Sequence, residues 1–134
     1  MVVTRPLVVI MVDDEVSVGF LSRMKFRQAI EDGSIELHFF EGARDCLKYL
    51  HAMKEHHGDM ILFTDINMPS ISGFDLLTQV KSQYPLIPVY MMSAYDDSAS
   101  VDKSKHLGAK GYFTKPVNFG DIKKLLNVDF GVEF

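Results

Sequence analysis

The sequence predicts a doubly wound α/β fold of the (βα)5 type, in which helices cover both faces of a parallel sheet. Five short apolar segments recur along the chain, and stretches of helical length separate them. Strands that alternate with helices favour a parallel sheet. Two of the segments, 7–12 and 60–63, are continuous apolar runs, which is typical of strands that are covered on both faces.

The predicted strands are rich in β-branched, aromatic and other apolar residues. They are LVVIMV (7–12), IELHFF (35–40), MILF (60–63), PVYMMS (88–93) and GYFT (111–114). Each is followed by a stretch long enough to hold a helix.

The segments between the strands carry apolar residues at the three- and four-residue spacing of amphipathic helices. In order, these stripes are Val16, Phe20 and Met24; Ala43, Cys46, Leu47, Leu50 and Met53; Leu76, Leu77 and Val80; and Phe119, Ile122, Leu125 and Leu126. We expect each stripe to face the sheet. Segment 96–108 offers only Ala99, Val101 and Leu107 as anchors, so we expect a loosely held helix there. Asn118 suits the N-cap of the last helix.

Composition restricts the chain to a few classes of protein. Its 134 residues, 47% hydrophobic and 24% charged, suit one domain with an apolar core. The longest apolar run of the first half, 7–12, is far shorter than the roughly 20 residues of a membrane helix, so we expect a soluble, cytoplasmic protein without a membrane contact. Cys46 is the only cysteine, which excludes an internal disulfide. A formal net charge of −4 argues against direct nucleic-acid binding.

Polar residues stand at the ends of four predicted strands. Asp13 and Asp14 follow the first strand, Asp65 comes at the end of the third, Ser93 ends the fourth, and Lys115 follows the fifth. In a doubly wound sheet, ligands bind beyond the carboxyl ends of the strands, so we expect these residues to meet. Singly, each has a structural explanation, such as acids that offset the positive end of a helix. Together, crowded carboxylates repel one another unless a cation lies among them, and oxygen ligands without His or Cys favour Mg²⁺.

Four motifs carry these residues in order: VDDE (12–15), TDINMPSISG (64–73), MMSAY (91–95) and GYFTKPV (111–117). From Val8 to about Leu126, the chain resembles the receiver domain of two-component response regulators. Each motif alone is weak, whereas the ordered set is highly specific. The resemblance implies a flavodoxin-like sandwich whose five-stranded parallel sheet has the order 2-1-3-4-5. It also implies a single receiver domain over 1–134, with a tail at 127–134.

The resemblance further implies a role for each site residue. Asp65 would accept a phosphoryl group from a phosphohistidine, and Ser93 and Lys115 would contact that group. The implied ligands of Mg²⁺ are Asp14, Asp65, the backbone carbonyl of Asn67 and, through a water molecule, Asp13. The side chains of Asn67 and Tyr95 would screen the path of the water that removes the phosphoryl group.

A switch and a set of partners follow from the same resemblance. Ser93 and Tyr112 would couple phosphorylation to the surface formed by 96–108, 111–114 and the last helix, and the Lys115–Pro116 bond would often be cis. The lysines of this surface are Lys103, Lys105, Lys110, Lys123 and Lys124. The implied partners are a sensor histidine kinase or histidine phosphotransfer protein, an output domain or downstream protein, and a second copy in a homodimer through this surface. We expect no turnover of an independent substrate.

Other functions stay open at this point. A haloacid-dehalogenase-like phosphatase also uses an aspartyl phosphate and Mg²⁺, but it needs a second aspartate where this chain has Asn67. A flavodoxin-like cofactor carrier would have to bind a flavin phosphate at the acidic segment 13–15, which would repel it. A degenerate receiver that binds partners without phosphorylation is compatible with the sequence. The alternating apolar tail fits both a free-standing regulator and a receiver cut from a longer regulator or hybrid kinase.

Overall fold

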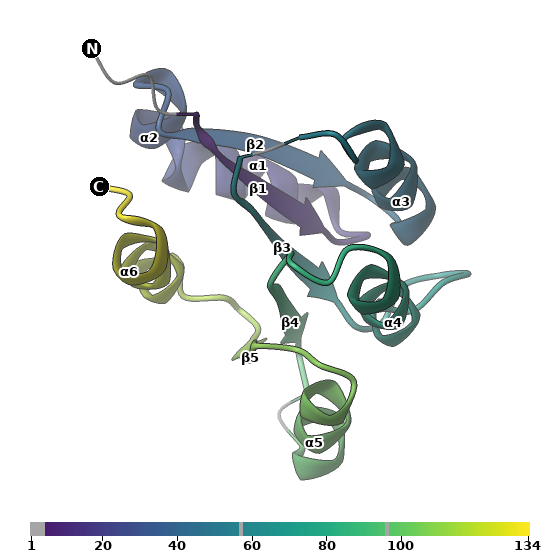
Figure 1. Ribbon diagram of the computed structural model, residues 1–134. Helices are drawn as coiled ribbons and strands as arrows, with labels where there is room; N and C mark the ends of the chain where they lie inside the picture. The colour runs from purple at the N-terminus through teal and green to yellow at the C-terminus, as the bar shows by residue number, and fades with distance from the viewer. Residues whose placement is uncertain (1–4, 57, 96) are drawn as a thin grey trace.

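The computed structural model describes residues 5–56, 58–95 and 97–134 (Figure 1). Its strands are β1 (Leu7–Val12), β2 (Ile35–Phe40), β3 (Met60–Asp65), β4 (Val89–Ser93) and β5 (Gly111–Thr114). Its helices are α1 (Val16–Lys25), α2 (Arg27–Glu31), α3 (Ala43–Ala52), α4 (Gly73–Gln83), α5 (Ser98–His106) and α6 (Phe119–Phe130). The strands agree with the predicted segments to within two residues. In the part of the chain that is described, no helix combines the length and the apolar character of a membrane span.

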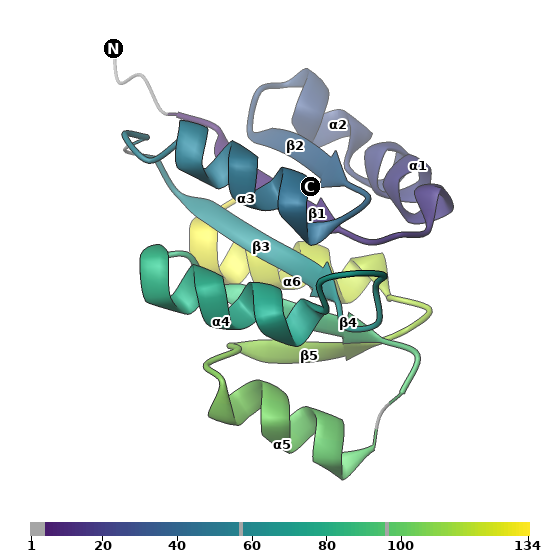
Figure 2. The same ribbon diagram turned by 90° about the vertical axis from the view of Figure 1, so that its right-hand side faces the viewer.

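The five strands form one parallel sheet in the order β2-β1-β3-β4-β5. This confirms the predicted fold class and strand order. All strands point the same way, so their carboxyl ends meet at one edge, on the right in Figure 2. Chain order reverses between β1 and β3, where doubly wound sheets hold their ligands.

Helices cover both faces of the sheet (Figure 1). Val9 and Met11 of β1 face one apolar core, together with residues of α2 and α6. Their neighbours Val8 and Ile10 face a second core, together with residues of α3 and α4. This alternation is the period-two pattern of a strand, and because each face is covered, β1 is buried along its whole length.

Helix α1 contradicts the expectation that every apolar stripe faces the sheet. The three residues of its predicted stripe are exposed: Val16 (47%), Phe20 (68%) and Met24 (72%). The helix instead buries Gly19 and Ser22, and a Cβ on Gly19 would come within 2.7 Å of the Phe39 ring. Small residues let the helix lie close to β2, so the large side chains point outward. The prediction for this stripe was therefore wrong.

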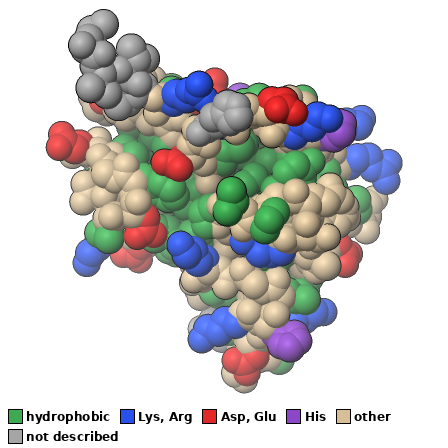
Figure 3. Space-filling model, in the orientation of Figure 1, with side chains coloured by type: hydrophobic (Ala, Val, Ile, Leu, Met, Phe, Trp, Pro, Cys, Tyr) green, Lys and Arg blue, Asp and Glu red, His purple; other side chains and the backbone are tan. Residues whose placement is uncertain are grey.

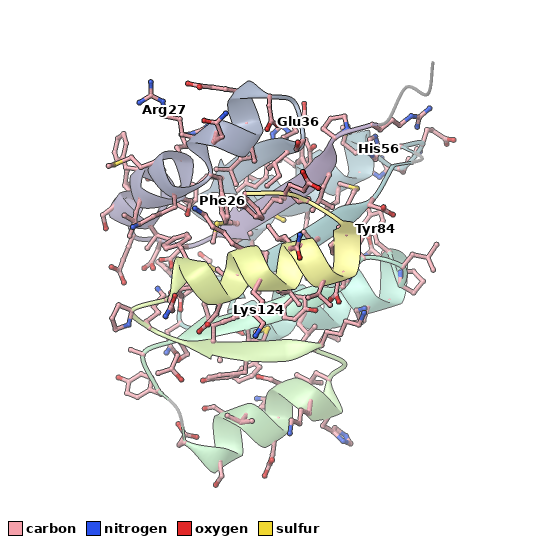
Figure 4. All side chains as sticks on the ribbon, turned by 90° about the vertical axis from the view of Figure 1, so that its left-hand side faces the viewer. Phe26, Arg27, Glu36, His56, Tyr84 and Lys124 are labelled. Atoms are coloured by element: carbon pink, nitrogen blue, oxygen red, sulfur yellow. The ribbon has the colours of Figure 1, made fainter. Side chains whose placement is uncertain are left out.

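Phe26 takes over the role of the large core residue next to α1. It is fully buried, and its ring packs edge-on against Phe119 of α6, with 5.7 Å between ring centroids. Figure 4 shows Phe26 between the α1–α2 region and α6. The core on this face is therefore closed by the residue that separates α1 from α2.

The last two helices differ in how firmly they are held. In α5 only Ser104 is buried, while Val101 is half-buried and Ala99 is exposed, which confirms the predicted loose anchoring. Helix α6 runs to Phe130 and ends at Gly131, whose φ of 71° suits a glycine C-cap. Val132 packs into the core beyond it. The predicted tail at 127–134 therefore begins inside α6, and its residues as far as Val132 belong to the folded domain.

Candidate functional site

The carboxyl edge of the sheet brings together the polar residues that were singled out in the sequence. Asp13 directly follows β1, Asp65 and Ser93 are the last residues of β3 and β4, and Lys115 directly follows β5. The parallel register places these strand ends side by side. Asp13 and Ser93 are at most 1% exposed and Asp65 is 6% exposed, so the site lies in the fold rather than on a flexible surface.

Three carboxylates form an acidic cluster at this edge. Asp13, Asp14 and Asp65 each place one oxygen within 4.8 Å of the others. Asp14 is exposed, whereas the other two are buried, so the cluster opens to solvent on one side. Carboxylates this close repel one another, and an all-oxygen set with an open side suits a hydrated divalent cation such as Mg²⁺. The chemistry of these donors therefore fits a metal site.

Lys115 lies beside the cluster and contacts three acids. Its Nζ is 2.5 Å from Asp13 Oδ2, 3.5 Å from Asp65 Oδ2 and 3.5 Å from Glu15 Oε1. Burial lowers the pKa of Lys115, but its hydrogen bond with Asp13 and the charges of Asp13, Asp65 and Glu15 outweigh burial and raise the pKa. The ammonium group is therefore a fixed positive charge next to Asp65.

The surroundings of Asp65 disturb the ionisation of its carboxylate. Burial and the charge of Asp13 raise the pKa of Asp65 to about 6, with a smaller contribution from Asp14, while Lys115 opposes the rise. A side chain with this perturbation, at the end of a buried strand and beside a lysine, has the features of a reactive group. A cation among the three acids would favour its ionised form.

The connection from β3 to α4 begins with two residues of opposite exposure. Ile66 is buried, and its backbone N–H donates to the carbonyl of Met92 at 3.1 Å. Asn67 is exposed and stands two residues after Asp65. Farther along, Ser70 has a φ of 69°, and the Ser72 side chain caps α4 by accepting a hydrogen bond from the Asp75 backbone N–H. The loop is therefore fixed at both ends.

Ser93, Tyr95 and Tyr112 are linked by hydrogen bonds. The backbone N–H of Tyr95 donates to Ser93 Oγ at 3.1 Å, and the Tyr112 hydroxyl donates to the backbone carbonyl of Tyr95. The Lys115–Pro116 bond is cis, and the Lys115 backbone N–H donates to the Ser93 carbonyl at 2.7 Å. The two residues expected to form a switch are thus joined through the backbone of a third.

Sequence reasoning gave no site role to three residues that the structure places here. Glu15 contacts Lys115, and the buried Thr64 donates its hydroxyl to the Asp65 carbonyl at 3.0 Å. Gly73 lies against the backbone of Asp65. All three residues stand inside the quoted motifs, which is the only signal that the sequence contained for them.

A cavity of about 1050 Å³ lies at the opposite edge of the sheet, where the strands begin. Its lining includes His56 and Tyr84, labelled in Figure 4, and the two lysines Lys81 and Lys110. That edge faces the viewer in Figure 3, where hydrophobic side chains gather at the centre and charged ones around them. None of the acids of the carboxyl edge lines this cavity, so the cavity is separate from the acidic cluster.

Comparison with known proteins matches residues 9–127 to the response regulator receiver domain. The DNA-binding transcriptional regulator NtrC of Proteus hauseri is 32% identical over 115 residues, which are 86% of this chain and 23% of that protein. The two-component response regulator ORR1 of Oryza sativa subsp. japonica is 31% identical over 100 residues, 71% of this chain and 43% of that protein. The chain therefore spans less than half the length of these curated relatives.

Solved structures agree with this match. A response regulator receiver protein from Pseudomonas putida has a TM-score of 0.76 at 25% identity and covers 96% of this chain and 100% of its own. The chemotaxis protein CheY4 of Vibrio cholerae has a TM-score of 0.74 at 25% identity, over 92% of this chain and 98% of its own. The receiver-domain complex of yeast Ssk1 with the histidine phosphotransfer signaling protein Ypd1 has a TM-score of 0.74 at 18% identity, which supports the fold. The chain belongs to the response regulator receiver domain family.

Proposed function

We propose that this chain is a phosphorylation-dependent signalling switch whose phosphoacceptor is Asp65. The observation that carries the proposal is the position of the Asp65 carboxylate, buried at a strand end between two other acids and Lys115. The phosphodonor would be the phosphohistidine of a sensor histidine kinase or of a histidine phosphotransfer protein. The yeast complex that resembles this fold pairs a receiver domain with a phosphotransfer protein, which supports that class of partner.

The reaction needs a nucleophile and positive charge. An oxygen of the Asp65 carboxylate attacks phosphorus, a P–O bond forms, and the P–N bond to the donor imidazole breaks with its electron pair left on nitrogen. Lys115 Nζ, 3.5 Å from Asp65 Oδ2, pairs with the incoming phosphoryl oxygens. Ser93 Oγ donates a hydrogen bond to one of them. Phosphoryl transfer asks the protein mainly for alignment and charge neutralisation, which these groups supply.

The acidic cluster would hold Mg²⁺, which supplies further positive charge to the phosphoryl oxygens when bound. Asp14, Asp65 and the backbone carbonyl of Asn67 are the proposed ligands, and Asp13 acts through a water molecule. Asp13 is held by Lys115 at 2.5 Å, which leaves the exposed Asp14 as the acid most available to a hydrated cation.

The exposed stripe of α1 suits the docking of the phosphodonor. A cavity of about 360 Å³ reaches α1 at Val18 and Leu21, and its other lining residues include Lys115, Glu15 and apolar residues of β4 and the β5–α6 connection. Leu21 belongs to this lining and is 42% exposed, and Phe20 next to it is 68% exposed. A cavity that holds Lys115 and has exposed apolar side chains of α1 next to it is where a protein donor would bury its own apolar residues.

Output would pass through the face formed by α5, β5 and α6. Its lysines, numbers 103, 105, 110, 123 and 124, fit either a homodimer with acidic cross-contacts or an acidic partner. Two of them are already engaged with aromatic rings, since Lys103 lies 4.5 Å from the Phe74 ring and Lys123 lies 5.4 Å from the Phe134 ring. We do not assign DNA binding to this face, because the relative named as DNA-binding is matched over only 23% of its length.

We propose self-dephosphorylation rather than turnover of an independent substrate. The phosphatase alternative needs an acid two residues after the nucleophile, and the Asn67 amide there has no proton of suitable acidity to donate. The chain would thus lose its phosphoryl group slowly to water and serve as a timed signal.

Phosphorylation with phosphoramidate, a small donor with a P–N bond, tests the proposed function. Intact mass should show a phosphoryl adduct with Mg²⁺ and none with EDTA. Asp14→Ala should need more Mg²⁺ for the same rate, because water cannot easily replace a carboxylate ligand of this ion. An adduct with no Mg²⁺ dependence would remove the metal from the proposal, and no adduct under any condition would favour the degenerate receiver.

A further inference from the structure

Gly73, the first residue of α4, lies against the backbone of the proposed phosphoacceptor. A Cβ at this position would come 2.0 Å from the carbonyl oxygen of Asp65, 2.9 Å from its carbonyl carbon and 2.8 Å from the Cα of Ile66. The Gly73 backbone N–H also donates to the Ile66 carbonyl at 2.8 Å. The first turn of the helix therefore touches the main chain at the point where β3 ends.

Close approach, not backbone conformation, is the reason for a glycine here. Gly73 is not among the glycines with positive φ. Other buried or half-buried glycines of the described ranges, such as Gly19 and Gly111, would place a Cβ against a side chain, which can move. All three atoms nearest to a Cβ on Gly73 belong to the backbone, so relief would require displacement of α4 or of the main chain at Asp65.

Two further hydrogen bonds, and the burial of the residue that makes one of them, show that this stretch of backbone has little freedom to move. The Thr64 hydroxyl donates to the Asp65 carbonyl at 3.0 Å, and the Ile66 N–H donates to the Met92 carbonyl at 3.1 Å. Thr64 itself is fully buried. Main chain at 65–66 is thus held between β4 on one side and the start of α4 on the other, and Asn67 follows directly.

We propose that Gly73 is a positioning residue for phosphoryl transfer. Because it has no side chain, the first turn of α4 can hold the backbone of Asp65 and Ile66 in place. This fixes the Asp65 carboxylate relative to Lys115, and the Asn67 carbonyl relative to the acidic cluster. The inference rests on the proposed function of Asp65 as phosphoacceptor.

The test compares Gly73→Ala with Gly42→Ala. Gly42 is the N-cap of α3, has an extended φ of −155°, and would have nothing within 4 Å of an added Cβ, so it is a matched helix-start glycine without the contact. For each variant, the rate of phosphoramidate labelling is measured across a Mg²⁺ titration, at a temperature well below unfolding. Each rate is divided by the concentration of folded protein. The ¹⁹F spectrum of the beryllofluoride adduct reports the geometry of the site independently of rate.

In Gly73→Ala we expect a rate at saturating donor and Mg²⁺ that is lower by about 10- to 100-fold, the scale of a displacement near 1 Å. We also expect a weaker apparent Mg²⁺ affinity and shifted ¹⁹F resonances, while Gly42→Ala keeps wild-type values. A folded Gly73→Ala with the wild-type rate and spectrum would overturn the inference. A loss of stability alone, with a normal rate per folded molecule, would overturn it too.

If Gly73→Ala does not fold, Thr64→Val carries the test. This change removes the hydroxyl that fixes the Asp65 carbonyl without adding volume. A slower rate with a shifted ¹⁹F spectrum supports the inference, and wild-type values overturn it. Failure of the wild-type chain to be labelled at all would instead refute the proposed function, so the two failures are distinguishable.

Discussion

Tyr112 donates a hydrogen bond from its hydroxyl to the backbone carbonyl of Tyr95, which joins β5 to the segment that follows β4. Tyr95 also donates its backbone N–H to Ser93 Oγ at 3.1 Å. The backbone of Tyr95 is thus held by the Ser93 hydroxyl through its N–H and by the Tyr112 hydroxyl through its carbonyl. If the Ser93 hydroxyl turns toward a phosphoryl group, one of these two restraints is lost.

The first prediction concerns Ser93 as the coupling residue. Shifting a two-state equilibrium from 1:99 to 99:1 takes about 5.5 kcal/mol, whereas one hydrogen bond to a charged group contributes about 1.5–3 kcal/mol. We therefore expect Ser93→Ala to reduce, and not abolish, the response of α5 and Tyr112 to beryllofluoride in NMR spectra, because Lys115 shares the work. Ser82→Ala, at an exposed position of α4, is the control. Identical responses in Ser93→Ala and wild type would show that Ser93 does not couple the site to α5.

Tyr95 should control the lifetime of the phosphoryl group. Its side chain is 62% exposed near the site and is large enough to obstruct the attacking water. Tyr95→Ala keeps the backbone carbonyl that Tyr112 contacts, so it removes the screen alone. We expect its autodephosphorylation, followed by mass spectrometry, to be several-fold faster than that of wild type and of Tyr112→Phe. Equal half-lives in Tyr95→Ala and wild type would refute the screening role.

Replacing Phe20 or Phe26 with alanine should have very different effects on the free energy of unfolding, although both are phenylalanines near α1. Phe20 is 68% exposed, so Phe20→Ala should change the free energy of unfolding by less than about 0.5 kcal/mol in urea titrations. Phe26 is fully buried, and Phe26→Ala should cost about 3–5 kcal/mol.

Phe20→Ala should also slow phosphorylation by a protein phosphodonor while labelling by phosphoramidate stays unchanged, since the small donor does not need the docking surface. Equal rates with the protein donor would exclude this stripe of α1 as its docking site.

The α1 stripe also shows what the sequence could not reveal. Apolar spacing identifies a helix but does not say which face is buried when small residues can pack more closely than large ones. Gly19 and Ser22 are the buried residues of α1, and the need for a glycine at position 19 depends on the position of the Phe39 ring, which only the tertiary structure shows. The strands were predictable because burial on both faces leaves continuous apolar runs.

The candidate site was predictable for a related reason. Parallel strands bring their carboxyl ends to one edge, so strand assignments alone were sufficient to bring Asp13, Asp65, Ser93 and Lys115 together. Hydrogen bonds around the site that use a backbone carbonyl as the acceptor were not predictable. The Tyr95 carbonyl and the Asp65 carbonyl are acceptors in any sequence, and only the fold shows that Tyr112 and Thr64 reach them.

In metal-free protein, the raised pKa of Asp65 should make the free energy of unfolding depend on pH. Burial and Asp13 raise this pKa from 3.8 to about 6, so the folded state binds a proton more tightly than the unfolded chain. The resulting contribution to stability is present below pH 3.8 and is lost as the pH rises through about 6. The free energy of unfolding of wild type relative to Asp65→Asn should therefore fall over this range in EDTA. Mg²⁺ should remove the fall, because it favours the ionised carboxylate, and a rise in EDTA would contradict the pKa assignment.

The central claim is that Asp65 is the phosphoacceptor, and the mass of the intact protein tests it most directly. Wild type and Asp65→Asn are incubated with acetyl phosphate and Mg²⁺ and compared in the same experiment. Of the three acids of the cluster, only Asp65 is the last residue of a strand, and its Oδ2 lies 3.5 Å from Lys115 Nζ. We predict a single phosphoryl adduct in wild type and none in Asp65→Asn, and an undiminished adduct in Asp65→Asn would contradict the account.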